Sequence, residues 1–420
     1  FFITHFFNPP RYMKLVEIIP SDKTNADLIA PMAVFLEETL GKGVVYAKDT
    51  PNFIANRIGV YGMMVTLDEA RKNKLSIEDV DALTGTLIGR PKSATFRTAD
   101  VVGLDTMCFV ANTAYEKCTN DPERETFKIP DYLQKMVDNE WLGQKSKQGF
   151  YKKIEKGVIH SIDLDTLEYS PQNKKRYAGI RLAKENVQMK DRLKALVNSD
   201  DTAGQFVWEV TAKALLYSAN RLGEIADDIV NIDRAMRWGF GWELGPFEAW
   251  DAIGVAESVE RMKKENKAIP QWISEMLASG NTSFYSRMEG FNCYWDVNKK
   301  DYLPIPVSAK ELRFTNFKYN GSLIENHWSA SLIDLGDGVA GVEFHSVLQA
   351  QLNPIDGSIL QILYVAQKWV KDNGYKGLVI SGDGANFCAG ANLNMILNSA
   401  YRKDWDELNR TVKTMQDILQ

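Results

Sequence analysis

The sequence has few cysteines and histidines, no long apolar run and no excess of positive charge. Its 420 residues include four cysteines without CxxC spacing and four histidines without an HExxH pattern. A disulfide scaffold is therefore disfavoured, and the sequence offers few of the cysteine and histidine ligands that a zinc site needs. No apolar stretch approaches the roughly 18 residues that span a bilayer. A net charge of −5 also lacks the basic character of nucleic-acid binders. We therefore expect a protein of a reducing, cytoplasmic compartment that has no membrane span and binds no nucleic acid or metal.

Neither end of the sequence carries the usual signals of a chain terminus. Phe1 is not a methionine and opens directly into a strand-like run. The final helical pattern, residues 404–420, stops without a glycine or a capping residue. We therefore expect a piece of a longer chain.

The pattern of apolar residues predicts two α/β segments around a long helical stretch. Residues 1–49 read as strand, strand, helix and strand, which is typical of a crossover in a parallel sheet. Residues 329–420 predict two strands, a helix, a third strand, a glycine-rich loop and further helix. Between them we expect two helical blocks, each followed by a linker: block 50–151 with linker 152–175, which could hold one hairpin, and block 176–280 with linker 281–328.

The two helical blocks resemble each other. In the first, the acidic segment 78–81 precedes a break and then Asp100 and Gly103; in the second, segment 230–233 precedes a break and then Asp251 and Gly254. The Asp–Gly pair is displaced by 151 residues at both of its positions. We interpret this as a duplicated helical unit. The alternative is chance similarity between two helical segments.

His5 and Glu17 are the first candidates for chemistry. His5 ends the opening strand, and loops at the carboxyl ends of parallel strands are where α/β sheets bind ligands. Glu17 follows across a reversal at residues 8–10, so the two side chains could approach each other. An imidazole held by a carboxylate is a general base suited to neutral pH. The alternative is a buried structural histidine with a convenient glutamate partner.

Several motifs together resemble the 3-hydroxyacyl-CoA dehydrogenase family, in the family's order. They are HFFNP (5–9), MKLVE (13–17), DTPNFIANR (49–57), VVGLD (101–105) and the closing motif GQKSKQGFY (143–151). The resemblance covers residues 1–151. It implies oxidation of (3S)-3-hydroxyacyl-CoA to 3-oxoacyl-CoA in fatty-acid β-oxidation, with NAD as the cofactor.

The resemblance also implies a role for each matching residue. His5 would take the proton of the 3-hydroxyl while hydride leaves for NAD, and Glu17 would orient His5. Asn56 would hydrogen-bond the reacting oxygen or the thioester carbonyl. Asn8 would lie near the nicotinamide, and Lys145 would contact the cofactor from the helical side. The structural alternatives are a helix cap or bridge for Asn56, a fixed turn for Asn8 and solvated surface for Lys145.

The sequence departs from the family pattern in three places. Asn52 stands where the family usually has glycine, and asparagine tolerates a left-handed backbone better than most residues. Residues 93–96 replace a Gly-Pro-Phe segment that the second block keeps at 245–247. The G-x-G-x-x-G turn of the family's cofactor domain has no match. Residues 1–49 are therefore expected to be only the last part of a Rossmann-type NAD-binding domain.

Residues 329–420 resemble the opening of an enoyl-CoA hydratase (crotonase) domain. The segment FCAGANL (387–393) follows a strand and opens a helix, where small residues let a ligand approach the backbone. The resemblance implies that the Ala391 N–H forms half of an oxyanion hole, and that the backbone of Ala389, Gly390, Ala391 and Leu393 frames the adenine end of CoA. The alternative is a tight turn without a ligand. The family's later oxyanion turn and its glutamates would follow residue 420, so we expect this stretch alone to hydrate nothing.

The sequence therefore predicts a bifunctional bacterial β-oxidation protein of multidomain α/β plus all-α fold. It would contain the end of a Rossmann-type domain, two repeated helical dehydrogenase domains and the start of a crotonase-type ββα domain. The second helical block carries no His–Glu pair, so we expect no active site there. We expect it to bury the apolar face through which single-unit family members dimerise.

Predicted partners are an acyl-CoA substrate and a thiolase, and the piece itself is expected to be inactive. One alternative is a non-catalytic acyl-CoA-binding or assembly scaffold that keeps the fold. The pair of His5 and Glu17 argues against it. Another is a dehydrogenase of sugar- or amino-acid-derived hydroxyacids, which the crotonase-like segment disfavours because it implies CoA.

Overall fold

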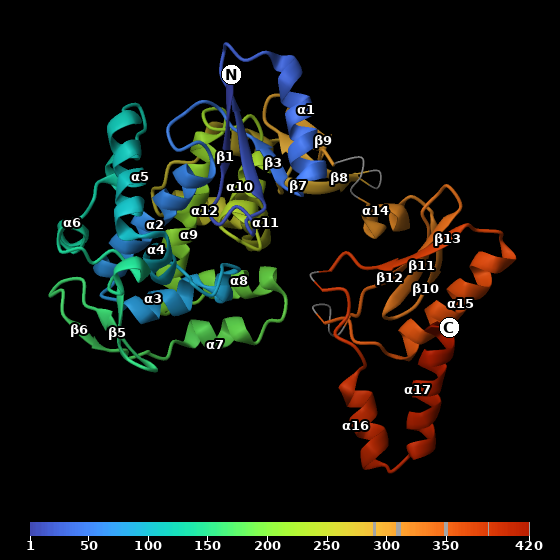
Figure 1. The fold of residues 1–420 in the computed structure, drawn as a ribbon. Coiled ribbons are helices and arrows are strands. Elements are labelled where there is room, and N and C mark those ends of the chain that lie inside the picture. Colours follow the sequence, from blue (N-terminus) through green and yellow to red (C-terminus); the bar gives the residue numbers. More distant parts are fainter. Residues whose placement is uncertain (289–290, 308–311, 348–351, 385, 420) are drawn as a thin grey trace. The chain divides into compact units, whose positions relative to one another are not determined.

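The computed structural model describes residues 1–288, 291–307, 312–347, 352–384 and 386–419 (Figure 1). The chain forms two compact units. Unit 1 comprises Phe1–Ser286 and Cys293–Leu303, and unit 2 comprises Arg287–Asn292 and Pro304–Gln420. Among the described residues, no helix combines the length and the apolar character that crossing a membrane requires.

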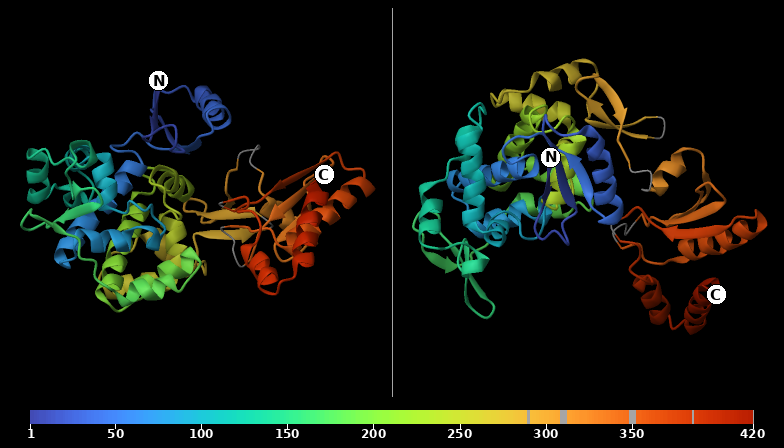
Figure 2. Two further views of the ribbon diagram at one scale, coloured as in Figure 1. Left: turned by 60° about the horizontal axis from the view of Figure 1, so that its bottom comes forward. Right: turned by 45° about the horizontal axis from the view of Figure 1, so that its top comes forward.

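A three-stranded sheet opens unit 1. Strand β1 (Phe2–Phe6) pairs antiparallel with β2 (Leu15–Pro20), and β2 pairs parallel with β3 (Gly43–Tyr46). Three short helices connect β2 to β3: η1 (Ala26–Leu28), α1 (Ile29–Val34) and η2 (Phe35–Thr39). The predicted crossover is confirmed, although its helical part begins at residue 26 and not at residue 21. Figure 2 shows the sheet and α1 together on one side of the helical block.

Strand β2 is buried on both faces because its side chains alternate between two neighbours. Val16 and Ile18 pack in a core that is shared with α1 and η2. Leu15 and Glu17 point to the opposite face, toward the helical block, where α10 (Ile229–Gly239) packs on β2 and β3. Glu17 therefore lies on the face of the sheet that meets the helices.

The helical block contains two copies of one arrangement, each with a long helix, four shorter helices and a three-stranded sheet. The first copy consists of α2 (Ala55–Lys72), α3 (Ile77–Thr84), α4 (Phe96–Val102), α5 (Leu104–Lys117), α6 (Asp131–Asp138), β4 (Tyr151–Glu155), β5 (Val158–Ile162) and β6 (Tyr169–Pro171), with short helices η3 (Thr86–Ile88), η4 (Arg124–Phe127) and η5 (Gln144–Ser146). The second consists of α9 (Thr202–Arg221), α10, α11 (Pro246–Ile253), α12 (Val255–Lys264), α13 (Gln271–Ala278), β7 (Tyr285–Met288), β8 (Phe291–Asp296) and β9 (Asp301–Pro304). Helices α7 (Ala178–Lys184) and α8 (Met189–Val197) connect them.

The first copy is held by two carboxylates, half-buried Asp81 and buried Asp100. Asp81 accepts hydrogen bonds from the N–H of Phe96 at 2.7 Å and from the hydroxyl of Tyr151 at 2.8 Å. Asp100 accepts from the N–H groups of Phe150 at 2.8 Å and Tyr151 at 2.9 Å. The two carboxylates thus tie the start of α4 and the end of α4 to the beginning of the small sheet.

The second copy repeats this network. Asp233 accepts from the N–H of Phe247 at 2.8 Å and from the hydroxyl of Tyr285 at 2.8 Å. Asp251 accepts from the N–H groups of Phe284 at 2.7 Å and Tyr285 at 2.9 Å. Because donors and acceptors match one for one, the structure supports a duplication over chance similarity.

The two segments that were predicted as linkers contain strands, and the hairpin expected in the first of them is present as β4 and β5. Residues 152–175 hold most of the β4–β5–β6 sheet, and residues 281–328 hold β7–β9, α14 (Phe314–Tyr319) and β10 (Leu323–Asn326). Buried Glu78 of α3 accepts from the hydroxyl of Ser161 at 2.7 Å and from the N–H of Asn173 at 2.6 Å. These polar segments resemble loops in the sequence, because the side chains that hydrogen-bond to them and hold them in place lie far away along the chain.

The long helices α2 and α9 pack against each other. Tyr61 stacks on Tyr217, with ring centroids 3.7 Å apart. Fully buried Arg57 donates to the hydroxyl of Tyr217 at 2.5 Å and to Asp121 at 2.6 Å. The second copy thus covers a helix face of the first within one chain, and its equivalence to a dimer face of single-unit family members stays a prediction.

Unit 2 has a four-stranded sheet in the order β10–β11–β12–β13. Strands β11 (Ala330–Asp334) and β12 (Val339–Phe344) are antiparallel, and β12 runs parallel to β13 (Gly377–Ser381). Helix α15 (Gly357–Asp372) packs on β11 and β12. The chain ends in two helices, α16 (Leu393–Tyr401) and α17 (Trp405–Leu419). The predicted order of elements from residue 329 onward is confirmed.

Candidate active site

His5 and Glu17 lie directly opposite each other on the antiparallel strands β1 and β2. Opposite residues in such a pair project to the same face of the sheet. His5 Nδ1 lies 2.6 Å from Glu17 Oε2. The predicted approach of the two side chains across the reversal is therefore confirmed. The expected position of His5 at the carboxyl end of a parallel strand is not, because β1 has no parallel neighbour among the described strands and the antiparallel register places His5.

Glu17 is fixed by the first turn of α2. Its Oε1 accepts from the N–H of Ile54 at 3.1 Å and of Ala55 at 2.9 Å, and its side chain is fully buried. The free N–H groups and the dipole at a helix start favour a carboxylate there. Because a carboxylate only accepts, Nδ1 of His5 must carry a hydrogen, which leaves Nε2 as the basic nitrogen. Nε2 has no hydrogen-bond partner within the described chain.

Two aromatic rings surround His5, whose side chain is 27% exposed. The ring centroids of Phe7 and Phe53 lie 4.8 and 5.5 Å from that of His5. Phe53 has φ +50° and Asn52 has φ +67°. The left-handed backbone expected at Asn52 is confirmed, and its side chain is anchored to the carbonyl of Val110 at 2.9 Å. A bulky residue with positive φ is uncommon and clusters at functional sites, and here this backbone brings the Phe53 ring to His5.

Asn56 and Asn8 lie next to the groups that hold this pair. Asn56 is the second residue of α2, adjacent to the Ala55 N–H that binds Glu17, and is half-buried. Asn8 is exposed and follows His5 by three residues, just beyond β1. In the part of the chain that the structure describes, neither side-chain amide has a hydrogen-bond partner. Both amides are therefore available to a ligand.

Lys145 lies in η5 and pairs with Asp105 near the start of α5. Its ammonium nitrogen is 2.5 Å from Asp105 Oδ1. This hydrogen bond holds the pKa of Asp105 below its ordinary value. These contacts do not bear on whether Lys145 meets a cofactor, so that role stays a prediction.

A residue of the second helical copy packs against the aromatic ring beside His5, and the sequence pattern did not predict this contact. Phe240, just after α10, packs edge-on against Phe7 with centroids 6.1 Å apart. The Phe240 ring also lies against Gly59 of α2, where an added Cβ would come within 2.0 Å of it. A glycine in the middle of a long helix is unfavourable by about 1 kcal/mol. Gly59 was therefore the one sequence feature that could have indicated a close contact at this point of α2.

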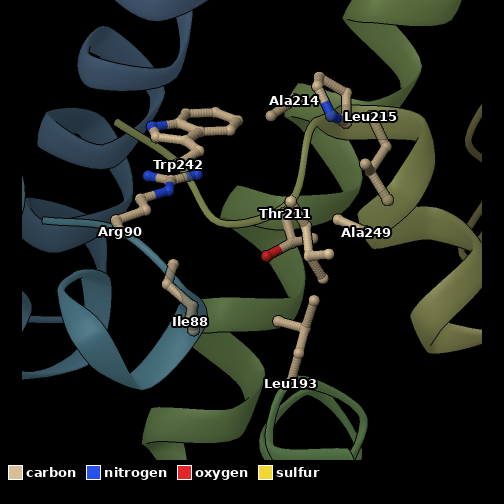
Figure 3. Close-up of a pocket in the computed structure, with 10 residues that line it drawn as sticks. Ile88, Arg90, Leu193, Thr211, Ala214, Leu215, Trp242 and Ala249 are labelled. Carbon is tan, nitrogen blue, oxygen red and sulfur yellow. The ribbon is translucent and has the colours of Figure 1, made fainter. Parts of the chain in front are cut away.

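A cavity of about 30 Å³ lies where the two helical copies meet (Figure 3). The guanidinium of Arg90 lies 4.2 Å from the ring centroid of Trp242, and burial lowers the pKa of Arg90 to about 10. Apart from Thr211, the other residues that line the cavity are apolar. This volume is about that of one water molecule, so the cavity is no substrate site.

In unit 2, the predicted glycine-rich segment joins β13 to α16. The Ala389 N–H donates to the carbonyl of Leu352 at 2.7 Å, and the Gly390 carbonyl accepts from Ile355 at 2.8 Å. Gly390 has φ +91°, and exposed Leu393 begins α16. The Ala391 N–H has no acceptor among the described residues, so it alone of the three consecutive amides is open to a ligand.

A histidine and carboxylate pair at the start of a buried helix, beside an α/β crossover, defines an enzyme-like site for proton transfer. The comparisons with known proteins agree with this class. Residues 1–50 match the family model "3-hydroxyacyl-CoA dehydrogenase, NAD binding domain", and residues 53–153 match "3-hydroxyacyl-CoA dehydrogenase, C-terminal domain". Residues 1–153 are therefore similar to the two domains of the 3-hydroxyacyl-CoA dehydrogenase family, and the cofactor of the matched domain is NAD.

Similarity to curated proteins extends over the whole chain. It is 47% identical over 416 residues to a probable 3-hydroxyacyl-CoA dehydrogenase of Bacillus subtilis, covering 99% of this chain and 52% of that protein. It is 26% identical over 432 residues to a putative fatty acid oxidation complex trifunctional enzyme of Rickettsia felis, covering 100% and 53%. The chain thus spans about half the length of these relatives.

Solved structures match parts of the chain. A 3-hydroxybutyryl-CoA dehydrogenase of Escherichia coli is 18% identical, with a TM-score of 0.44, and covers 66% of this chain and 70% of its own. An (S)-3-hydroxybutyryl-CoA dehydrogenase of Ralstonia eutropha is 29% identical, with a TM-score of 0.33, and covers 36% and 50%.

Proposed function

We propose that the complete protein oxidises (3S)-3-hydroxyacyl-CoA to 3-oxoacyl-CoA with NAD+. The observation that carries this proposal is the 2.6 Å contact between His5 Nδ1 and buried Glu17, which leaves Nε2 free on a half-buried ring. The family of residues 1–153 supports the substrate class and the cofactor.

In this mechanism, His5 Nε2 accepts the proton of the substrate's 3-hydroxyl. Glu17 accepts the Nδ1–H throughout and stabilises the imidazolium that forms, because its own position is fixed by two N–H groups of α2. The Asn56 amide donates a hydrogen bond to the reacting oxygen or to the thioester carbonyl. Phe7 and Phe53 shield the imidazole from water.

The residues present fit one side of a nicotinamide site. The exposed Asn8 amide has no partner among the described residues and follows the strand that carries His5. NAD+, when bound, supplies the acceptor for the hydride that leaves C3. Asn8 would hold the cofactor there, and we retain Lys145 as a second candidate contact.

The test of this function is NADH formation by the complete protein with (3S)- and (3R)-3-hydroxyacyl-CoA of the same chain length. The proposal predicts turnover of the 3S form alone. If the protein binds acyl-CoA but forms no NADH from either isomer, the alternative of a non-catalytic scaffold is correct. Turnover of hydroxyacids that carry no CoA would favour the other alternative.

We further propose that residues 329–420 open an enoyl-CoA hydratase domain. The free Ala391 N–H favours this, because an oxyanion hole needs an unpaired amide where a thioester oxygen becomes negative. The Rickettsia felis relative, whose name includes "trifunctional", spans the whole chain. Ala389, Gly390 and Leu393 would frame the CoA.

The variant Ala391→Pro removes this N–H and tests the hydratase proposal. Hydratase activity of the complete protein should fall about 10²–10³-fold, while dehydrogenase activity stays unchanged. Unchanged hydration, or no hydration by the wild type, would refute it. The thiolase partner stays a prediction.

A further inference from the structure

A basic groove lies where the segment that connects the two helical copies passes α3 and η3. It has a volume of about 1010 Å³, and α7 packs against both α8 and η3 beside it (Figure 1). Six cationic side chains line it: Lys174, Lys175, Arg176, Arg181, Lys184 and Arg192. Glu185 is the one acidic residue of the lining. We call this site the 174–192 groove.

The segment that lines the groove is positively charged, whereas the chain as a whole is negatively charged. Residues 174–192 hold seven lysines and arginines but two acidic residues, a net charge of +5, whereas the whole sequence carries −5. Within the described residues, none of the six lining cations forms an ion pair. Arg192 donates from Nη1 to the carbonyl of Thr86 at 3.4 Å, and its Nε is buried without an acceptor. A concave cluster of unpaired cations focuses a positive potential that attracts anions.

The nearby carboxylates Asp79 and Asp201 hold the backbone and, among the described residues, form no ion pair with the lining cations. Buried Asp79 accepts from the N–H of Lys175 at 3.0 Å and from the hydroxyl of Tyr177 at 3.1 Å. Asp201 accepts from the N–H of Gly179 at 2.9 Å, just inside α7. The main chain that carries the cations is thus fixed at both ends of the 175–179 stretch, which reduces the entropy cost of binding.

Apart from Glu185 and the six cations, the groove is lined by uncharged residues, most of them apolar. Leu87 and Ile180 line it, and the ring of Tyr177 is held in place through its hydroxyl. The volume is at the upper end of the range of about 300–1,000 Å³ for small-molecule sites. The lining therefore suits a ligand that has several negative charges at one end and a ring or apolar part at the other.

We propose that the 174–192 groove binds a small molecule that carries a pyrophosphate group and a ring, in a site separate from His5. Two sources have this chemistry: a free nucleoside diphosphate and the phosphorylated end of coenzyme A. Lysine and arginine form strong charge-assisted hydrogen bonds to phosphate oxygens, and the apolar wall contacts the ring.

The experiment is calorimetric titration of the complete protein with three probes: inorganic pyrophosphate, ADP and CoA. The groove variant is Lys174→Gln with Lys184→Gln, and the matched control is Lys153→Gln with Lys156→Gln, which removes two exposed lysines outside the groove. All four lysines are exposed, so both variants should keep the fold. We expect saturable binding that weakens at least about tenfold in the groove variant and not in the control. Binding should also weaken at high salt.

The three probes distinguish the source. Equal affinity for ADP and CoA, above that of pyrophosphate, supports a nucleotide ligand, and tighter binding of CoA supports coenzyme A. The proposal is overturned if no probe saturates, if the control variant weakens binding as much as the groove variant, or if poly-glutamate binds more tightly than every phosphate probe. His5→Gln should leave this binding unchanged, so the groove can fail or succeed independently of the proposed dehydrogenase.

Discussion

Glu17 determines what His5 can do. The carboxylate is held by two N–H groups at the start of α2 and faces Nδ1 of His5, so the hydrogen on Nδ1 is fixed and Nε2 faces outward as a base. The spacing of His5 and Glu17 around a reversal made their approach predictable from sequence. The positive φ of Phe53 and the contact of Phe240 with Gly59 were not, because they depend on how α2 meets elements far along the chain.

Glu17→Gln should reverse the tautomer of His5. A glutamine can still accept from α2 through its oxygen, but its amide then donates to Nδ1 and moves the hydrogen to Nε2. We expect kcat to fall about 10³–10⁴-fold, with KM and melting temperature little changed. Steady-state kinetics and thermal unfolding of the same samples check this. A parallel rise in KM and loss of stability would instead indicate a structural role.

The aspartates of the duplicated network should make the free energy of unfolding depend on pH. Burial raises the pKa of Asp81, Asp100 and Asp251 to about 6, against an ordinary value of 3.8. Between these values the folded state binds more protons than the unfolded state. The contribution of each carboxyl group to the free energy of unfolding is therefore complete below about pH 4 and is lost as the pH rises through 6.

Asp100→Asn tests this dependence because asparagine does not titrate. The deficit in unfolding free energy relative to wild type should be about 1 kcal/mol larger at pH 5 than at pH 7.5. Urea unfolding at the two pH values measures it. A deficit that is equal at both, or smaller at pH 5, contradicts the raised pKa.

At the scale of elements, a buried ion pair of the first helical copy meets Tyr217 of the second copy where α2 packs against α9. The side chains of Arg57 and Asp121 are 0% and 1% exposed, and Tyr217 hydrogen-bonds to both. Removing Asp121 leaves the buried Arg57 guanidinium only the longer pair with the part-exposed Glu224, at 3.3 Å.

Asp121→Ala should therefore lower the unfolding free energy by about 3–5 kcal/mol. The control is Asp165→Ala, which breaks the exposed pair with Arg71 and should cost less than about 1 kcal/mol. Chemical denaturation of both variants decides the point. Equal losses would mean that the junction contributes no more than a surface pair.

Sequence periodicity predicted most of the elements that pack by an apolar face: the crossover of residues 1–49, helix α2, and the strands and helices from residue 329 onward. It predicted only one hairpin for β4–β6 and none of β7–β9. These small sheets have few apolar residues and are fixed by carboxylates such as Glu78, Asp100 and Asp251, which lie tens of residues away in the sequence. The repeat could be found because the Asp–Gly pairs that carry the network keep their spacing.

At the scale of the whole molecule, the chain divides into two compact units with separate cores. Units of this kind unfold as separate cooperative transitions when few contacts join them. Calorimetry should resolve two transitions, and Asp121→Ala should shift only the one that belongs to unit 1. A single transition that moves as a whole would show that the units unfold together.

The role of His5 as the general base is tested most directly by comparing kcat of three forms of the complete protein: wild type, His5→Gln and His160→Gln. The substrates are (3S)-3-hydroxyacyl-CoA and NAD+. His160 lies on β5 and serves as the matched control. Loss of a general base predicts that His5→Gln lowers kcat by about 10²–10⁴-fold, while His160→Gln stays near wild type. If His5→Gln keeps kcat within a few-fold of wild type, His5 is not the base.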